Sequence, residues 1–184
     1  LRAVAEPPHP AVVRAGVATP AEGEVIDRAT AIDHVLQIAA AEVGKGSSRI
    51  GAYRRVLNAP PGSPWCVSFV SYCLREGLGY LPIHTPTYCS SRLRRWGRRR
   101  GLLHEYPERG DICLLVGNLD VIDHHNLCWH VALVEEVSGD RITLIEGNGF
   151  QHRGARNEVQ RNWTTRTYIR KLFLRWVDNV NRDV

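Results

Sequence analysis

The stretch Pro64-Trp65-Cys66-Val67-Ser68-Phe69-Val70 has the pattern of a buried helix with a cysteine in its first turn. Ser63 before Pro64 is a helix-start signal, because a hydroxyl caps free N–H groups and proline needs no N–H bond there. Apolar residues then recur at three- and four-residue spacing until two glycines end the pattern. A thiol near the positive end of a helix dipole has a larger thiolate fraction, which is the nucleophilic form. Cys66 is therefore a candidate nucleophile, although a small core cysteine shows the same pattern.

The composition suits one globular domain. The chain has 184 residues, of which 43% are hydrophobic, enough for one core and hardly for two. No apolar run of about 18 residues is present, so the sequence predicts no membrane span. Because the chain begins at Leu1 and has no methionine, we expect a fragment or a processed chain.

The net charge of +5 is carried almost entirely by arginine, since only Lys45 and Lys171 are lysines. This balance favours an anionic partner, such as a cell-wall polymer, an anionic lipid or nucleic acid. The charge is densest around Leu93 and Trp96, where the pattern fits either a solvated helix face or a contact with an anionic polymer. The arginines of this segment are Arg92, Arg94, Arg95, Arg98, Arg99 and Arg100.

The five cysteines are an odd number without close pairs, so we expect no disulfide framework and at least one free thiol. No CxxC spacing is present, which gives no support to a structural zinc site. The loop over residues 117–128 contains aspartate and histidine but lacks a defined ligand spacing, and we predict no metal site. This loop is a candidate lid or specificity loop.

Helices are predicted first along the chain. Residues 1–25 lack periodicity and predict a linker or flexible arm. An amphipathic helix follows over residues 26–43, with a capping box from Thr30 to Asp33. The cysteine helix and an arginine-rich helix that ends near Arg100 come next.

Strands are predicted in the second half. Residues 112–116 form an apolar run of strand length, and residues 131–137 and 142–145 flank turn residues, as in a β-hairpin. Residues 168–177 predict a last strand or two. The order predicts an α+β fold in which N-terminal helices, with the nucleophile at a helix N-terminus, pack on an antiparallel sheet. We expect the domain to span residues 26–178, with residues 179–184 as a tail.

A cysteine nucleophile needs a base, and the base needs an orienting partner. Among eight histidines, His130 directly precedes a predicted strand, which would fix its backbone. If Val137 pairs with Arg141, His130 lies opposite Asn148, and Glu146 lies two positions along on the same face. Either polar side chain could then reach the imidazole, whereas a slip of one residue would turn both away.

Four motifs follow one another along the chain: Pro64-Trp65-Cys66 with Phe69-Val70, Gly110-Asp111-Ile112, His130-Val131-Ala132-Leu133-Val134, and Glu146-Gly147-Asn148. In this order they resemble the CHAP family of cysteine, histidine-dependent amidohydrolases and peptidases. The chain resembles this family over about residues 27–177. The resemblance implies a papain-like α+β fold and cleavage of peptidoglycan amide bonds through a thioester acyl-enzyme, without a cofactor.

By position, the resemblance implies Cys66 as nucleophile, His130 as base, Glu146 as orienting carboxylate and Asn148 as an accessory polar group. We expect three aromatic residues at the substrate: Trp65, Trp129 and Tyr53. Trp129 stands where the family often has a smaller residue, and Tyr53 has a packing role as its alternative.

The leading hypothesis is a peptidoglycan amidase or endopeptidase, either a lysin or autolysin or an antibacterial effector. Such a protein would be secreted or delivered to the bacterial envelope, and an effector would have a delivery or immunity partner. One alternative is a cysteine protease or deamidase toxin that acts on a protein. The other is a basic module that binds nucleic acid or the envelope; nucleic acid is disfavoured because, beyond Trp96, no aromatic residues alternate with the arginines as stacking platforms.

Overall fold

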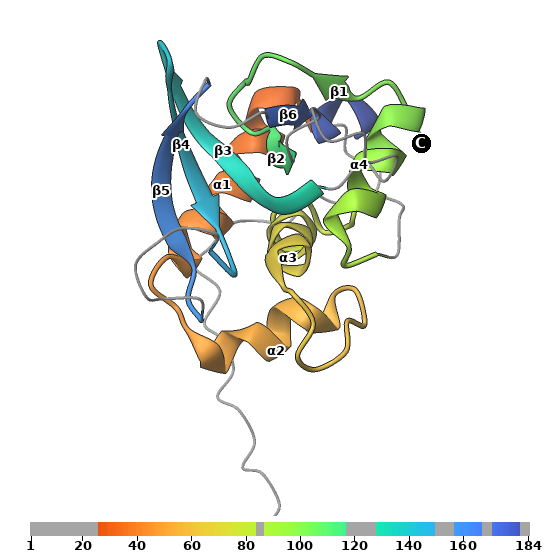
Figure 1. Cartoon of the computed structure of the whole chain (residues 1–184), viewed down its shortest axis with the longest axis vertical. Helices are drawn as coiled ribbons and strands as arrows, with labels where there is room; N and C mark the ends of the chain where they lie inside the picture. Colours follow the sequence, from red (N-terminus) through yellow and green to blue (C-terminus); the bar gives the residue numbers. More distant parts are fainter. Residues whose placement is uncertain (1–25, 84–86, 117–127, 150–156, 167–170, 181–184) are drawn as a thin grey trace, which may run out of the picture.

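The computed structural model of the chain describes residues 26–83, 87–116, 128–149, 157–166 and 171–180 (Figure 1). The predicted arm and nearly all of the predicted lid loop lie outside these residues. The helices are α1 (Arg28–Glu42), α2 (Ser47–Arg55), α3 (Cys66–Leu78), α4 (Ser90–Arg99) and a 3-10 helix, η1 (Trp176–Asn179). The strands are β1 (Leu103–His104), β2 (Ile112–Val116), β3 (Cys128–Ser138), β4 (Arg141–Glu146), β5 (Gln160–Thr165) and β6 (Lys171–Leu174).

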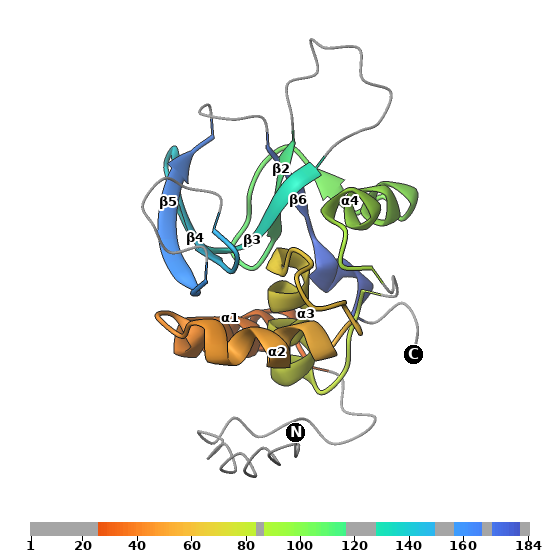
Figure 2. The ribbon, with the colours of Figure 1, turned by 60° about the horizontal axis from the view of Figure 1, so that its bottom comes forward.

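The six strands form one antiparallel sheet in the order β1-β6-β2-β3-β4-β5. Helices α1, α2 and α3 lie together on one side of it, and α4 lies beside β3 and β1 (Figure 2). Alternate side chains of the strands enter two different apolar clusters, as the pleat requires. One cluster combines apolar side chains of the helices with Val131 and Leu133 of β3, and the other contains Ala132 and Val134 of the same strand. The predicted α+β fold class is confirmed.

Helix α3 begins at Cys66, later than the Ser63-Pro64 pattern predicts. Its N-cap is Trp65, which makes no side-chain cap bond, and the Ser63 hydroxyl donates to the Pro60 carbonyl at 2.6 Å instead. The predicted serine cap is therefore wrong, and the cysteine is the first helical residue. The predicted end is confirmed, since the helix stops at Gly79 with φ of 81°.

The structure differs from the sequence prediction at two other boundaries, the start of α1 and the end of the domain. Asp27, rather than the Thr30 capping box, caps α1, and its carboxylate accepts from the backbone N–H of Ala29 at 2.9 Å. At the other end of the domain, Asn179 is 2% exposed and Val180 is 6% exposed. Packed structure therefore continues two residues beyond the predicted start of the tail.

The β3–β4 hairpin turns on two residues, Gly139 and Asp140, and Ser138 pairs with Arg141. The predicted three-residue turn is therefore wrong. Gly139 has φ of 58°, which glycine adopts without the strain that a side chain would add.

A β-bulge at Glu135 then shifts the pairing by one residue, so that Leu133 lies opposite Ile145. Past the bulge, toward His130, β3 and β4 are therefore paired residue for residue as the predicted three-residue turn would have paired them. Glu146 consequently lies on the same face of the sheet as His130, as predicted, because the bulge compensates for the shorter turn.

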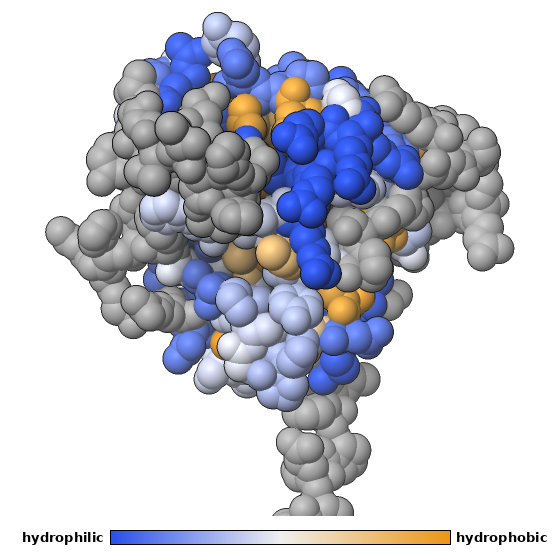
Figure 3. All heavy atoms as spheres, turned by 45° about the vertical axis from the view of Figure 1, so that its right-hand side comes forward, coloured by the Kyte–Doolittle hydropathy of each residue, from blue (hydrophilic) through white to orange (hydrophobic). Residues whose placement is uncertain are grey.

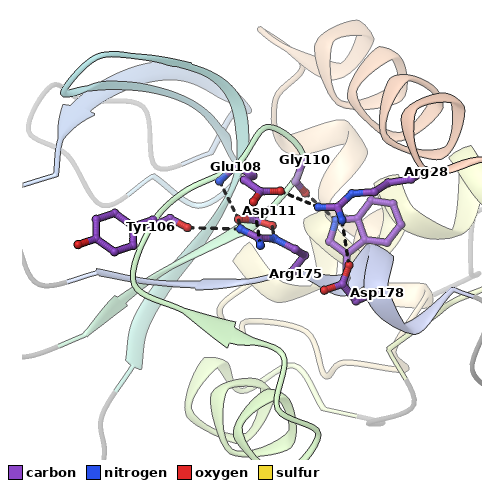
Figure 4. Close-up of polar contacts among 8 residues, drawn as sticks. Arg28, Tyr106, Glu108, Gly110, Asp111, Arg175 and Asp178 are labelled. Atoms are coloured by element: carbon purple, nitrogen blue, oxygen red, sulfur yellow. Dashed lines mark hydrogen bonds and ion pairs between the residues drawn. The ribbon is translucent and has the colours of Figure 1, made fainter.

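The Gly110-Asp111 motif fixes the C-terminal segment (Figure 4). Gly110 has φ of 91°, and a Cβ there would lie 2.7 Å from Cγ1 of Ile32. The Asp111 carboxylate accepts from Arg175 at 3.2 Å, and the Trp176 indole donates to the Gly110 carbonyl at 2.6 Å. This motif therefore joins α1, the start of β2 and the last helix, and its role is structural.

The ring of Trp65 packs on the backbone of Gly147. A Cβ at this glycine would lie 2.3 Å from Cζ3 of Trp65 and 2.9 Å from Cβ of Phe69. Trp65 is 2% exposed and stacks on Tyr53 with ring centroids 5.5 Å apart. Two motifs that are far apart in the sequence thus form one packing unit, which places the start of α3 at the end of β4.

We expect Gly147→Ala to lower the free energy of unfolding by about 1–3 kcal/mol, because the added methyl group overpacks the Trp65 ring. Urea unfolding measures the change. Gly51→Ala is the matched control: Gly51 is exposed on α2, and a Cβ there would lie 3.8 Å from Nη1 of Arg55, its nearest neighbour atom. That variant should be more stable by up to about 1 kcal/mol through helix propensity. A Gly147→Ala protein as stable as the native chain would contradict the packing argument.

Candidate active site

The thiol of Cys66 forms a hydrogen bond with the imidazole of His130. The cysteine is the first residue of α3, and the histidine lies on β3 opposite Leu115. Both side chains are buried, with 3% and 2% of each residue exposed. The packed helix start and the sheet therefore fix the two reactive groups from opposite sides.

Glu146, the last residue of β4, supplies the carboxylate. Its Oε2 lies 2.7 Å from Nε2 of His130, and the residue is 3% exposed. Because Nε2 faces the carboxylate, Nδ1 is the ring nitrogen left for the thiol. The structure thus brings together three of the four predicted catalytic residues in a row of thiol, imidazole and carboxylate.

Asn162 extends this row, and the sequence analysis missed it. Its side-chain amide donates to Oε1 of Glu146 at 2.5 Å and to Oε1 of Gln160 at 3.4 Å. It lies on β5, the edge strand beside β4, where Glu146 pairs with Gln160. Residues 160–165 are polar on both faces and gave no strand signal. The only sequence feature that indicates a strand here is the alternation of Gln, Asn and Thr with Arg and Trp.

Asn148, the fourth predicted catalytic residue, lies outside the hydrogen-bonded row. It has φ of 60°, a left-handed conformation that asparagine tolerates better than most residues. Among the described residues its side chain makes no hydrogen bond to His130 or Glu146. The chain turns away at this residue directly after β4, and Asn162 takes the place beside the carboxylate.

The three predicted substrate-binding aromatics have different surroundings. Tyr53 is fully buried and its hydroxyl donates to Glu42 at 2.7 Å, while Trp65 packs on Gly147. These two rings are core residues with no face open to a substrate, which corrects the expectation for both. Trp129 is the extra residue of a bulge in β3 and is 57% exposed, so its ring is open beside His130.

The pKa of His130 reflects opposing effects. Burial disfavours the imidazolium, but hydrogen bonds and charge interactions with Cys66 and Glu146 outweigh it and raise the pKa to about 9. The imidazole lies where it can take up the thiol proton and pass a proton to a leaving group, which are the tasks of the base in cysteine-dependent acyl transfer. The row is therefore arranged for nucleophilic chemistry.

The other buried thiols lack such an arrangement. Burial raises the pKa of Cys128 to about 12, and it also raises the pKa values of Cys73 and Cys113. All five cysteines are free, whereas the count predicted at least one free thiol and no disulfide framework. Where the structure describes the chain, no group of three or more His, Cys, Asp or Glu side chains could hold a metal ion.

A thiol, an imidazole and a carboxylate in one hydrogen-bonded row at a helix start form the class of site that cysteine-dependent acyl transfer requires. The family model of the CHAP domain matches residues 58–148, which include Cys66, His130 and Glu146. This match confirms the resemblance to the CHAP family that the four motifs indicated. Asn162 lies beyond the matched residues.

Among solved structures, the chain is similar to the crystal structure of Ly7917, with 20% identity and a TM-score of 0.47. It is also similar to the crystal structure of Ly7917 with the hydrolyzing product of MDP, with 18% identity and a TM-score of 0.44. In both comparisons the match covers 78% of this chain and 62% of that chain. No curated protein matches the chain.

We expect NMR titration of the His130 ring to give an apparent pKa near 9, and Glu146→Gln to lower it because a neutral amide no longer stabilises the imidazolium. The folded-state pKa exceeds the unfolded value of about 6.5. The associated stability is thus fully present below about pH 6.5 and is lost as the pH rises toward 9, as urea unfolding would measure.

Glu135→Gln is the control for this titration, since it removes a carboxylate from β3 that pairs with Arg161 on the surface. It should leave the His130 titration unchanged. A His130 pKa near 6.5 in the native chain would contradict the arrangement.

Proposed function

We propose that the chain is a cysteine-dependent peptidoglycan hydrolase that cleaves an amide bond of the stem peptide, as an amidase or an endopeptidase. The observation that carries this proposal is the row Cys66, His130 and Glu146 within the residues that match the CHAP domain. The family resemblance supports peptidoglycan as the substrate, and the row supports the type of chemistry.

In the proposed reaction, the Cys66 thiolate attacks the carbonyl carbon of the scissile amide. His130 donates its proton to the departing nitrogen, and a thioester to the cysteine remains. The now neutral imidazole accepts a proton from water, and the resulting hydroxide attacks the thioester, releasing a carboxylic acid and the thiolate. Glu146 keeps the ring oriented and stabilises its protonated form in both steps.

The start of α3 suits the oxyanion of the tetrahedral intermediates. The first N–H groups of a helix have no intrahelical acceptor, and the N-cap Trp65 provides no side-chain acceptor. The backbone N–H of Cys66 is therefore our candidate oxyanion donor, assisted by the helix dipole.

We place the site of action at the bacterial envelope, in the periplasm or cell wall. None of the helices in the described part of the chain is long and apolar enough to cross a membrane. We also propose that the chain acts as a lysin or as a secreted antibacterial effector, and that an effector would have a delivery or immunity partner.

The first test is mass spectrometry of soluble fragments released from purified peptidoglycan. The native chain should release fragments whose masses distinguish an amidase from an endopeptidase, and Cys66→Ala should release none. Cys89→Ala is the control, because it removes an exposed thiol that is not part of the row. If the folded native chain releases nothing from peptidoglycan but cleaves or deamidates a protein, the alternative protein substrate replaces this proposal.

Asn162→Ala should lower kcat by roughly 10- to 150-fold, because a hydrogen bond to a charged group contributes about 1.5–3 kcal/mol. Asn148→Ala should have a smaller effect on kcat, since Asn148 makes no bond to the carboxylate. A merely structural role for Asn162 would lower stability without moving the alkaline limb of the pH–rate profile, whereas a positioning role moves it to lower pH. Equal rates for Asn162→Ala and the native chain would contradict the positioning role.

A further inference from the structure

Helix α4 presents four exposed arginines that have no partner within the described residues. We call Arg92, Arg95, Arg98 and Arg99 the α4 arginine face. In the part of the chain that the structure describes, none of these guanidinium groups forms an ion pair or a hydrogen bond. Figure 3 shows a strongly hydrophilic patch on the side of the molecule where α4 lies.

Several exposed arginines elsewhere in the described residues are paired with carboxylates of the same chain, whereas the exposed Arg55 and Arg141 have no carboxylate partner there. The pairs are Arg28 with Glu108 and Asp178, Arg75 with Glu76, Arg109 with Asp33, Arg161 with Glu135, and Arg166 with Asp140. These pairs neutralise part of the positive surface charge. Within the described residues, the α4 arginine face is where four exposed arginines without a carboxylate partner lie together on one helix.

The orientation of α4 is fixed by its opposite side. A Cβ at Gly97 would lie 2.7 Å from Cδ1 of Leu174 and 3.2 Å from Cδ2 of Leu103, so the helix backbone packs directly on β6 and β1. Leu93 is fully buried on the same side. The arginines therefore cannot rotate into the protein and must face solvent.

This accumulation has a cost. Like charges three or four residues apart on a helix destabilise it by about 0.2–0.5 kcal/mol per pair. Arg92, Arg95 and Arg99 have this spacing and form a stripe roughly 10 Å long. An external polyanion would relieve the repulsion, and guanidinium groups bind phosphate oxygens through paired hydrogen bonds.

The composition of α4 favours a phosphate polymer without bases. Trp96, the one aromatic side chain of α4, is half-buried, and the Arg100 guanidinium lies 5.4 Å from its ring centroid. The helix therefore offers no free aromatic platform of the kind that stacks nucleic-acid bases. Its exposed face also has no apolar side chain of the kind that inserts into a lipid surface.

We propose that the α4 arginine face binds a phosphodiester-bearing polymer of the bacterial cell wall, and so keeps the enzyme on its substrate. The assignment of the polymer to the wall rests on the proposed function. Helix α4 is also joined to the catalytic strand, because the backbone N–H of Cys128 donates to the Ser91 hydroxyl at 3.0 Å, two residues before His130. A polymer on this face would thus lie beside the strand that bears the catalytic base.

The test measures binding of Cys66→Ala protein, which does not cleave, to purified walls before and after hydrofluoric acid removes their phosphodiester polymers. We expect Kd on intact walls to be at least tenfold lower than on stripped walls. Replacing Arg92, Arg95 and Arg99 by Gln should remove this difference. It should also reduce the slope of log Kd against log salt by roughly 2, since three phosphate contacts are lost.

The matched control replaces Arg75, Arg109 and Arg166 by Gln, which removes the same charge from exposed positions that are paired internally. It should retain the preference for intact walls, and far-UV circular dichroism checks that both variants fold. Equal losses in the two variants would overturn the proposal, because net charge alone would then explain binding. Tighter binding to single-stranded DNA or to anionic vesicles than to intact walls would overturn it as well.

Hydrolysis of stripped walls by the chain with Cys66 intact separates this inference from the proposed function. Release of fragments from stripped walls, combined with no preference for intact walls, would refute the role of the α4 arginine face and leave the hydrolase proposal standing. No release from either preparation would refute the hydrolase proposal itself.

Discussion

The contact between the Trp65 ring and the Gly147 backbone determines where the reactive groups meet. Trp65 precedes the candidate nucleophile and Gly147 follows the carboxylate, so this contact sets the distance between the start of α3 and the end of β4. Overpacking or a cavity at such a contact lowers the free energy of unfolding by about 1–3 kcal/mol, because protein interiors are close-packed. The geometry of the site is therefore held by apolar packing, and the polar row is arranged within it.

The sheet supplies the second constraint, which is register. Bulges at Glu135 and at Trp129 interrupt β3 on either side of its central part. The first compensates for a two-residue turn and keeps Glu146 on the face of His130. The second makes Trp129 an extra residue of β3 that is exposed, while His130 stays buried. Irregular pairing is thus what aligns the imidazole with both of its partners.

Electrostatics are used differently at the two functional regions. In the buried row, each charged group has a partner: Glu146 accepts from His130 and from Asn162, and the imidazole also contacts Cys66. Desolvated charges are costly unless they are paired, which accounts for the completeness of this network. The four residues of the α4 arginine face, by contrast, are exposed to water, where an unpaired charge costs little and stays available to a partner.

The sequence by itself determined the elements with strong local signals. Helix α3, its end at Gly79, strand β2 and the hairpin follow from periodicity and turn residues, and the four motifs indicated the resemblance to the CHAP family. The cap of α3, the bulges and edge strand β5 were not predictable locally, because they depend on contacts between distant segments. For this reason only the tertiary structure placed Asn162 beside Glu146, moved Asn148 out of the row and buried Tyr53 and Trp65. A polar edge strand has no pattern of its own, and its place is decided by pairing with β4.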